Sequence, residues 1–310
     1  MAEPAPIAFS LLGRRLSAEG VGPDLARWLR AHWEYPDTGA AAAPYQIVIR
    51  SRDQPPPAGS GSPQQVTVPN GSLTLHRSGN AWRYARGESG VELCLLDQGC
   101  GITQWGWERA PEPGEFHVAL YVMIAEGLRA SGLVPLHAAV AARQGCATAW
   151  LGVSGSGKSS TLLRAARAGW EPVAEDLVWL EPGAGRAHGW DRAVRVWPAT
   201  LNRFFPDLGG APAPDGKLLI PYQALGPARP RVARLERLVL LAREESGPSR
   251  WERVNGAEVT RALWEAAGVG LAPHGRDAVS RCVAQLVRRL PASRLVLGDG
   301  EPTLEPPGLS

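Results

Sequence analysis

Short segments of alternating hydrophobic and polar residues dominate the first part of the chain. Between residues 45 and 108, β-branched and apolar runs are separated by turns rich in glycine, proline and asparagine. This pattern predicts an antiparallel sheet of about five short strands. Apolar residues at helical spacing predict a short helix over 22–33 and a longer one over 114–132, which Gly132 can end. We therefore expect an α+β domain with an antiparallel sheet over residues 1–132, a candidate for binding a substrate or peptide.

From residue 133 the pattern changes to apolar strands that alternate with amphipathic helices. Two apolar runs meet at a turn at Gln144–Gly145, and a helical segment then ends at Gly169. One strand over 170–182 follows, and strands and helices alternate through the rest of the sequence. This order is typical of an α/β fold, so we expect a second domain over residues 133–310.

Composition narrows the class of protein. Hydrophobic residues make up 44% of the 310, which is sufficient for a sizeable core. No run of about eighteen uncharged apolar residues marks a membrane helix, and the N-terminus lacks the basic segment of a signal peptide. We expect a cytoplasmic protein with no membrane partner. The net charge of +3, without a dense Lys/Arg block, argues against a nucleic-acid partner. The four cysteines lack metal-like spacing, which indicates unpaired, mostly buried thiols in a reducing compartment.

Lysine is rare in this sequence. Of the 33 basic residues only Lys158 and Lys217 are lysines, and the others are arginines. A lysine carries a compact charge on a flexible stem, whereas a guanidinium is a wide planar fork. A retained lysine can therefore mark a position that arginine does not fit, although chance survival explains Lys217 equally well.

Residues 152–159, GVSGSGKS, match the phosphate-binding motif G-x-x-x-x-G-K-[ST], with an apolar strand before them and a helix after them. Glycines let successive backbone N–H groups point at phosphate oxygens, and a helix N-terminus adds partial positive charge. Lys158 is expected to reach the β- and γ-phosphates of ATP, and the Ser159 hydroxyl to hold Mg²⁺. The expected nucleotide-binding residues are Gly152, Ser154, Gly155, Ser156, Gly157, Lys158, Ser159 and Ser160.

An acid pair, Glu175 and Asp176, lies in the next predicted strand, and Asp176 is eighteen residues past Lys158. Because helix and strand follow each other so closely, we expect the pair beside the phosphate loop, at the end of the strand where α/β ligands bind. One carboxylate there can bind Mg²⁺, and a second can accept a proton from an attacking hydroxyl. An acidic surface loop is the alternative, but apolar residues flank the pair on both sides. The expected metal ligands are Ser159, Glu175 and Asp176.

The segment from His137 to Leu180 resembles the HPr kinase/phosphorylase family. That family carries a histidine fifteen residues before the first loop glycine, a G-x-S-G-x-G-K-S loop, a helix that ends near a glycine, and an A-D-D strand end. Here His137 stands fifteen residues before Gly152, the loop matches, Gly169 ends the helix, and A-E-D replaces A-D-D.

The resemblance implies a P-loop kinase core of the HPr kinase and phosphoenolpyruvate carboxykinase type. It implies that Asp176 is the base that deprotonates the acceptor serine, that His137 assists Asp176, and that Glu175 lies near the metal. The resemblance is close over residues 137–180, loose over residues 135–300, and absent from residues 1–130. Two departures are that glutamate replaces the first aspartate, and that the Pro-Gly-Arg-Asn loop tied to phosphorylase activity is missing. The chain is thus more similar to stand-alone relatives, among them kinases that phosphorylate a serine of lasso-peptide precursors.

These features together predict an ATP- and Mg²⁺-dependent kinase with Asp176, His137 and Lys158 as catalytic residues. The expected acceptor is a serine hydroxyl on a peptide or small protein. Two alternatives stay open: a kinase of the same fold that acts on free serine or another metabolite, and a nucleotide-binding module or ATPase that phosphorylates no acceptor. True HPr kinases form hexamers. Residues 1–130 do not resemble the N-terminal half of those enzymes, so a homo-oligomer is possible here but does not follow from the resemblance.

Three further cations are candidates to contact the phosphoryl group or the substrate, although a surface charge is the more common role for such residues. They are Arg195, Arg203 and Lys217.

Overall fold

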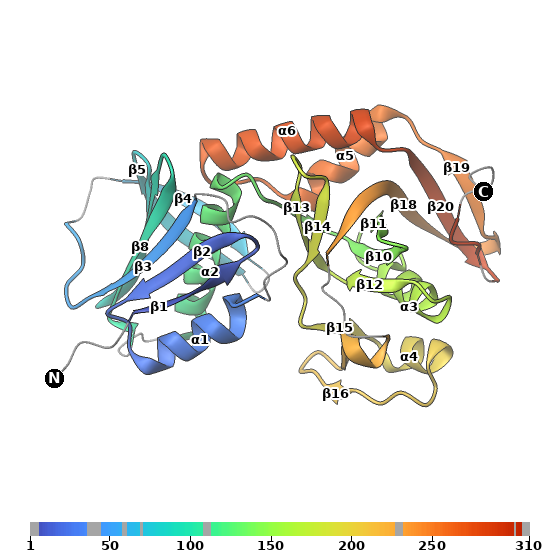
Figure 1. The fold of residues 1–310 in the computed structure, drawn as a ribbon, viewed down its shortest axis with the longest axis horizontal. Coiled ribbons are helices and arrows are strands. Elements are labelled where there is room, and N and C mark those ends of the chain that lie inside the picture. Colours follow the sequence, from blue (N-terminus) through green and yellow to red (C-terminus); the bar gives the residue numbers. More distant parts are fainter. Residues whose placement is uncertain are drawn as a thin grey trace. The chain divides into compact units, whose positions relative to one another are not determined.

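The computed structural model describes residues 6–35, 45–57, 61–68, 71–107, 113–226, 232–300 and 302–305. It is a mixed α/β protein that divides into two compact units (Figure 1). Unit 1 comprises residues 1–131 and 271–275, and unit 2 comprises residues 132–270 and 276–310. Within the described ranges, no helix is both long enough and apolar enough to cross a membrane.

Unit 1 is built on an eight-stranded sheet. In spatial order its strands are β1 (Ile7–Leu11), β2 (Arg14–Glu19), β3 (Gln46–Arg52), β8 (Gly99–Trp105), β7 (Ser89–Leu96), β6 (Ala81–Arg86), β5 (Gly71–Ser78) and β4 (Ser62–Val68). Strands β4 to β8 form the predicted antiparallel meander. Strand β3, however, pairs in parallel with both β2 and β8. The prediction of an antiparallel sheet is therefore wrong at β3, because alternation shows which side chains face the core but not which strand lies alongside.

Both helices predicted in unit 1 are present, as α1 (Pro23–Trp33) and α2 (Pro113–Ala130). Helix α2 contacts β7 and β8 of the sheet. Its fully buried Glu126 accepts hydrogen bonds from the backbone N–H groups of Leu271 and Ala272, at 2.9 and 3.2 Å. These bonds tie the late segment 271–275 into unit 1.

Unit 2 contains a large mixed sheet and a small one. The large sheet runs in the order β12 (Glu171–Ala174), β10 (Ala139–Arg143), β11 (Cys146–Leu151), β18 (Val232–Pro248), β14 (Arg186–Gly189), β13 (Leu177–Glu181) and β9 (Val134–His137), with β20 (Ala292–Asp299) on β18 and β19 (Arg250–Arg253) on β20. Strands β11, β18 and β20 pair in parallel, and the other pairings are antiparallel. The small sheet has the order β15 (Ala193–Val196), β17 (Leu218–Pro221) and β16 (Ala211–Pro212).

Helices cover both faces of the large sheet. They are α3 (Lys158–Arg167), α4 (Pro198–Phe204), α5 (Gly256–Ala267) and α6 (Pro273–Arg289). Trp150 of β11 belongs to the core that includes α3 and α4, whereas its neighbour Leu151 belongs to the core that includes α5 and α6. A strand buried on both faces has a nearly continuous apolar sequence, which is why this segment could be recognised in the sequence.

The prediction of a single strand over 170–182 is wrong. The segment is divided into β12 and β13, with Glu175 and Asp176 between them. The two halves pair with different strands, β12 with β10 and β13 with β9. Those partner strands are themselves separated at Ala138, whose N–H donates to the carbonyl oxygen of Asp176 at 3.1 Å. The acid pair therefore lies in a break between two strands.

All four cysteines are free thiols, as expected. Cys100 and Cys282 are buried, but Cys94 and Cys146 are exposed, so the expectation of mostly buried thiols is correct for only two. Exposure depends on the direction of each side chain in its strand or helix, which the spacing of the cysteines does not determine.

Candidate active site

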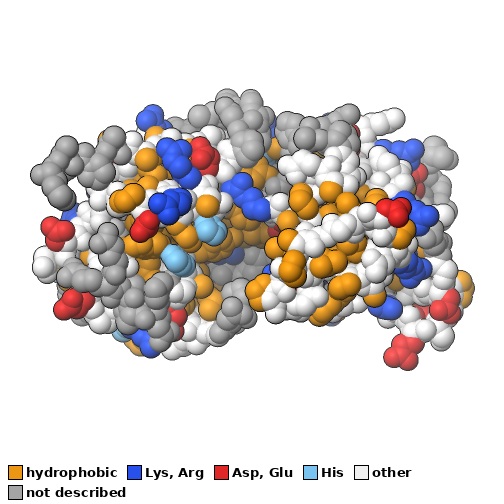
Figure 2. Space-filling model, turned by 90° about the horizontal axis from the view of Figure 1, so that it is seen from below, with side chains coloured by type: hydrophobic (Ala, Val, Ile, Leu, Met, Phe, Trp, Pro, Cys, Tyr) orange, Lys and Arg blue, Asp and Glu red, His pale blue; other side chains and the backbone are white. Residues whose placement is uncertain are grey.

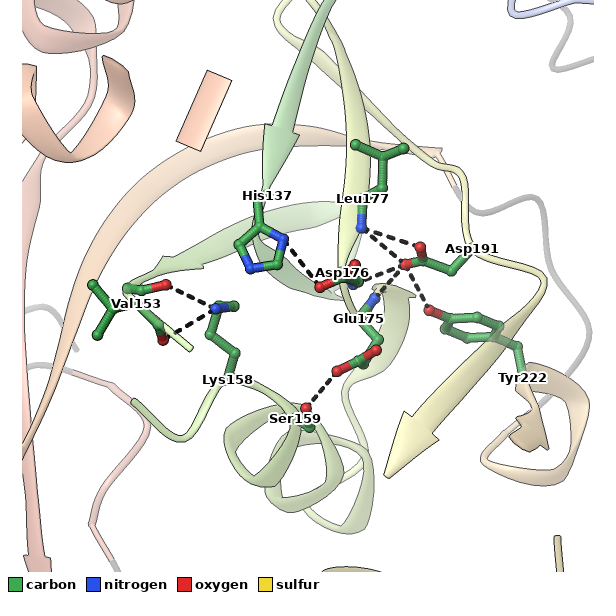
Figure 3. Close-up of polar contacts among 10 residues, drawn as sticks. His137, Val153, Lys158, Ser159, Glu175, Asp176, Leu177, Asp191 and Tyr222 are labelled. Atoms are coloured by element: carbon green, nitrogen blue, oxygen red, sulfur yellow. Dashed lines mark hydrogen bonds and ion pairs between the residues drawn. The ribbon is translucent and has the colours of Figure 1, made fainter. Parts of the chain in front are cut away.

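The phosphate-binding motif forms the loop between β11 and α3, at the end of a strand that pairs in parallel with β18 (Figure 3). Gly157 precedes α3 with a left-handed backbone, φ 101°. A Cβ atom on Gly157 would lie 2.5 Å from Leu297 Cδ1, and one on Gly152 would lie 2.5 Å from Ser156 Oγ. The shape of the loop therefore requires glycine at both positions.

The remaining loop residues differ in how far they are exposed to solvent. Ser154 and Gly155 are exposed, whereas the side chain of Ser156 is buried. Ser156 Oγ has no hydrogen-bond partner in the described part of the chain, and the Ser156 N–H donates to the carbonyl oxygen of Val153 at 3.1 Å. Ser160 is half-buried in the first turn of α3. Among the four serines predicted to bind the nucleotide, Ser156 is the one whose side chain is buried.

Lys158 is the first residue of α3 and is only 6% exposed. Its ammonium group donates hydrogen bonds to the carbonyl oxygens of Gly152 at 2.7 Å and Val153 at 3.3 Å. Burial lowers the pKa of Lys158, and the carboxylates of Asp176 and Glu175 act in the opposite direction. The loop thus places a positive charge within reach of both acidic side chains.

Ser159 and Glu175 are in direct contact. The Ser159 hydroxyl donates a hydrogen bond to Glu175 Oε1. Burial raises the pKa of Glu175, the bond from Ser159 lowers it, and the nearby charges of Asp176 and Asp191 raise it further. The Glu175 side chain therefore reaches the serine of the loop.

This pair fits a magnesium ion that is only partly coordinated by protein. Hydroxyl and carboxylate oxygens are ligands that Mg²⁺ prefers, and the ion usually keeps several waters and substrate phosphate oxygens. Within the described ranges, no group of three or more His, Cys, Asp or Glu side chains is arranged to hold a metal. The donors Ser159 Oγ and Glu175 Oε1 accordingly suit an ion whose other ligands come from phosphate and water.

His137 and Asp176 form the second pair of the site. His137 is the last residue of β9 and lies opposite Leu177 in the ladder, so its side chain reaches the break beside Asp176. His137 Nδ1 is 3.0 Å from Asp176 Oδ1. The hydrogen bond from His137 is the largest effect on the pKa of Asp176 and lowers it, whereas partial burial raises it. Because both side chains are exposed, at 46% and 57%, the ionised carboxylate can be reached by another molecule.

Asp191, which was not predicted from the sequence, shapes the break that carries the acid pair. Its carboxylate accepts hydrogen bonds from three consecutive backbone N–H groups, those of Glu175 (2.8 Å), Asp176 (2.9 Å) and Leu177 (3.1 Å). The Tyr222 hydroxyl donates to the same carboxylate at 3.4 Å (Figure 3). Burial raises the pKa of Asp191, and the backbone N–H groups oppose that effect. In the sequence Asp191 stands two residues after β14 and belongs to no recognised motif.

The three candidate cations have different positions. Arg195 Nη2 lies 2.9 Å from Asp215 Oδ2, and Lys217 Nζ lies 3.9 Å from the same oxygen. The charge of Lys217 lowers the pKa of both Lys158 and Asp176. Arg203 is exposed on α4, where its guanidinium lies over the ring of Phe204. The structure thus brings Lys217 to the site, and within the described ranges no hydrogen bond or ion pair joins Arg203 to it.

A cavity of about 450 Å³ lies elsewhere in unit 2, beside the β13–β14 turn and the C-terminal part of α6. Its wall includes Arg234, which lies opposite Cys146, the first residue of β11. The phosphate-binding loop follows the last residue of that strand, at its other end. Two of its arginines are neutralised, Arg186 by Glu181 at 2.8 Å and Arg234 by Glu236. This cavity is therefore separate from the loop and the acid pair.

No protein-family model matches this sequence, and no curated protein matches it. A functional assignment accordingly depends on the residues and contacts described above.

Proposed function

We propose that this chain is an ATP-dependent kinase that phosphorylates a hydroxyl group, the serine of a peptide or small protein. The observation that carries the proposal is one contact. His137 Nδ1 lies 3.0 Å from Asp176 Oδ1, within a site that also contains a glycine-rich loop with Lys158. A loop of this kind binds a nucleoside triphosphate, and the histidine–aspartate pair adds a group that can accept a proton.

The loop and Lys158 provide the nucleotide side of the proposed site. Backbone N–H groups of the exposed loop residues would bind phosphate oxygens. Lys158 would exchange its two carbonyl partners for the β- and γ-phosphates, because a charge-assisted bond to phosphate is stronger than a bond to a neutral carbonyl. These interactions orient the terminal phosphate and partly neutralise its charge.

Ser159 and Glu175 would hold Mg²⁺. When bound, the ion neutralises charge on the phosphate oxygens. Glu175 keeps the Ser159 hydroxyl directed to this position through their hydrogen bond.

Asp176 would act on the acceptor side. Its low pKa means that the carboxylate is ionised at neutral pH and free to accept a hydrogen bond from the acceptor hydroxyl. As the acceptor oxygen forms its bond to phosphorus and the bond to the leaving diphosphate breaks, the hydroxyl proton passes to Asp176. His137 holds the carboxylate in position through the bond to Oδ1, which leaves Oδ2 for the acceptor.

The exposure of His137 and Asp176 favours a peptide over a small metabolite as the acceptor. A metabolite kinase encloses its substrate, whereas a peptide kinase needs an open approach to its catalytic carboxylate. We further propose that unit 2 has the fold of HPr kinase-like enzymes, that unit 1 binds the peptide, and that the reaction takes place in the cytoplasm.

Mass spectrometry after incubation with ATP and Mg²⁺ tests the proposal. The acceptors are a library of serine-containing peptides, the same peptides with alanine in place of serine, and free serine. We expect one added phosphate on serine peptides only. Phosphorylation of free serine alone would replace the peptide with a metabolite, and ADP without a phosphorylated acceptor would reduce the chain to an ATPase.

A further inference from the structure

The second of the two lysines lies beside the proposed site, on the small sheet of unit 2. Lys217 directly precedes β17, whose register pairs Leu218 with Val196 of β15. Strand β15 in turn lies beside the acid pair, because the backbone of Arg195 is close enough to the Glu175 carboxylate to lower its pKa. At the other end of β17, the Tyr222 hydroxyl contacts Asp191. Strand β17, which Lys217 directly precedes, is thus linked to the site through β15 on one side and through Tyr222 at its end.

The side chain of Lys217 is held by weak contacts. Its ammonium lies 5.6 Å from the centre of the Trp197 ring and 3.9 Å from Asp215 Oδ2, which is beyond hydrogen-bond distance. Asp215 already accepts a hydrogen bond from Arg195 at 2.9 Å. A strongly charged ligand can therefore draw Lys217 away without leaving Asp215 unpaired.

The surroundings of Lys217 are open. Trp197 is 55% exposed. Figure 2 views the molecule from the side of α4 and β16 and shows hydrophobic side chains at the surface of this part of unit 2, with Lys and Arg side chains at its borders. An ammonium group on such a surface can move toward a ligand at little cost in desolvation.

We propose that Lys217 is a second phosphate-contacting lysine, whose ammonium group binds the terminal phosphate of a nucleoside triphosphate held by the loop. This inference rests on the proposed function, because it requires a triphosphate at Lys158. It also offers a reason for lysine at this position in a chain with only one other lysine: an ammonium group is a compact charge on a flexible stem, whereas a guanidinium is a wide planar fork.

The proposed contact has a specific energetic signature. ADP lacks the terminal phosphate, so Lys217 would strengthen binding of the triphosphate and leave binding of ADP unchanged. A hydrogen bond between charged groups is lost when Lys217 becomes alanine, and such a loss weakens binding by about tenfold or more. Lys158 would contact the β- and the γ-phosphate, so it would contribute to the affinity for the triphosphate and to the affinity for ADP.

Isothermal titration calorimetry with AMP-PNP and with ADP, each with Mg²⁺, tests the inference on the full chain. In Lys217→Ala we expect the Kd for AMP-PNP to rise about tenfold and the Kd for ADP to stay within about twofold. Asp215→Asn, which removes the competing carboxylate but keeps the turn, should not weaken AMP-PNP. Arg281→Ala removes one exposed positive charge from α6 and serves as the control, with both affinities unchanged.

Three results would overturn the inference: unchanged AMP-PNP affinity in Lys217→Ala, an equal loss for both nucleotides, or a loss of the same size in Arg281→Ala. The proposed function is judged separately. If AMP-PNP affinity depends on Lys217 but the wild-type chain phosphorylates no hydroxyl, the proposed kinase activity is refuted and the proposed phosphate contact stands. A wild-type chain that binds neither nucleotide would refute both.

Discussion

Asp176 is the residue on which the proposed chemistry depends. Replacing Asp176 with asparagine keeps the size of the side chain but removes its ability to accept a proton. We expect the single-turnover rate of phosphoryl transfer to fall by about 10²- to 10⁴-fold, with AMP-PNP affinity within about twofold of wild type. Rapid-quench measurements with a serine peptide give the rate, and calorimetry gives the affinity.

His137→Gln is the matched variant, because glutamine can still donate a hydrogen bond to Asp176. We expect it to lose less activity than Asp176→Asn. Transfer at the wild-type rate in Asp176→Asn would remove this residue as the base.

Asp191 is predicted to stabilise the break between β12 and β13. In Asp191→Ala three backbone N–H groups lose their acceptor, and an unsatisfied buried group costs about 1–3 kcal/mol. We expect the free energy of unfolding in urea to fall by about 3 kcal/mol. Tyr222→Phe removes only the 3.4 Å bond and should cost less than about 1 kcal/mol. Equal losses in the two variants would contradict this role of Asp191.

Single residues were predictable from the sequence only where a local motif contained them. Lys158 and Ser159 follow from the loop motif, and the loop is local because β11 and α3 are adjacent in the chain. Asp191 could not be predicted, since its role depends on backbone groups fifteen residues away that it meets only in the folded chain. The effect of the Lys217 charge on Lys158 and Asp176 likewise depends on residues far apart in the sequence, although the scarcity of lysine had drawn attention to Lys217.

Helix α3 provides a test at the scale of the element, because glycines with left-handed backbones stand at both ends. Gly157→Ala brings Cβ to 2.5 Å from Leu297 Cδ1, so the loop must shift and AMP-PNP binding should weaken by at least about tenfold. Gly169 has a φ of 82°, but a Cβ atom added there in Gly169→Ala would meet no neighbouring atom within 4 Å. This substitution should cost about 1 kcal/mol of stability through backbone strain and leave AMP-PNP affinity unchanged. Equal binding by the two variants would contradict the shape given to the loop.

Elements were predictable where hydrophobic periodicity determines them. The helices α1 and α2, the strand β11 and the turn at Gln144–Gly145 all follow from short sequence patterns. The break at Glu175–Asp176 did not, because an apolar run on both sides looks continuous. What interrupts the strand is a change of partner, from β10 to β9, and a side-chain acceptor from elsewhere in the chain.

Across the whole molecule, nucleotide binding should stabilise unit 2. A ligand at one hundred times its Kd adds about 2.7 kcal/mol to the free energy of unfolding if it binds only the folded state. We expect thermal unfolding to shift upward with AMP-PNP and Mg²⁺, and hydrogen exchange to slow in β11, the loop and α3. Lys158→Ala should remove both effects. Protection confined to unit 1 would contradict the location of the site.

The order and direction of strands were the least predictable features at this scale. Strand β3 pairs with β8, which lies about fifty residues later, and parallel to it. Such pairings depend on how the whole sheet packs around its core. The alternation of hydrophobic and polar residues along a strand does not show which strand it pairs with. The large sheet of unit 2 is likewise mixed, with parallel pairs only where β11, β18 and β20 meet.

The ratio of phosphorylated serine peptide to ADP formed in a single turnover tests the proposed kinase most directly. If the chain transfers phosphate to a hydroxyl through Asp176, the wild-type ratio should approach one, and Asp176→Asn should form neither product at an appreciable rate. Formation of ADP by the wild-type chain with no phosphorylated peptide or metabolite would contradict phosphoryl transfer to a hydroxyl acceptor.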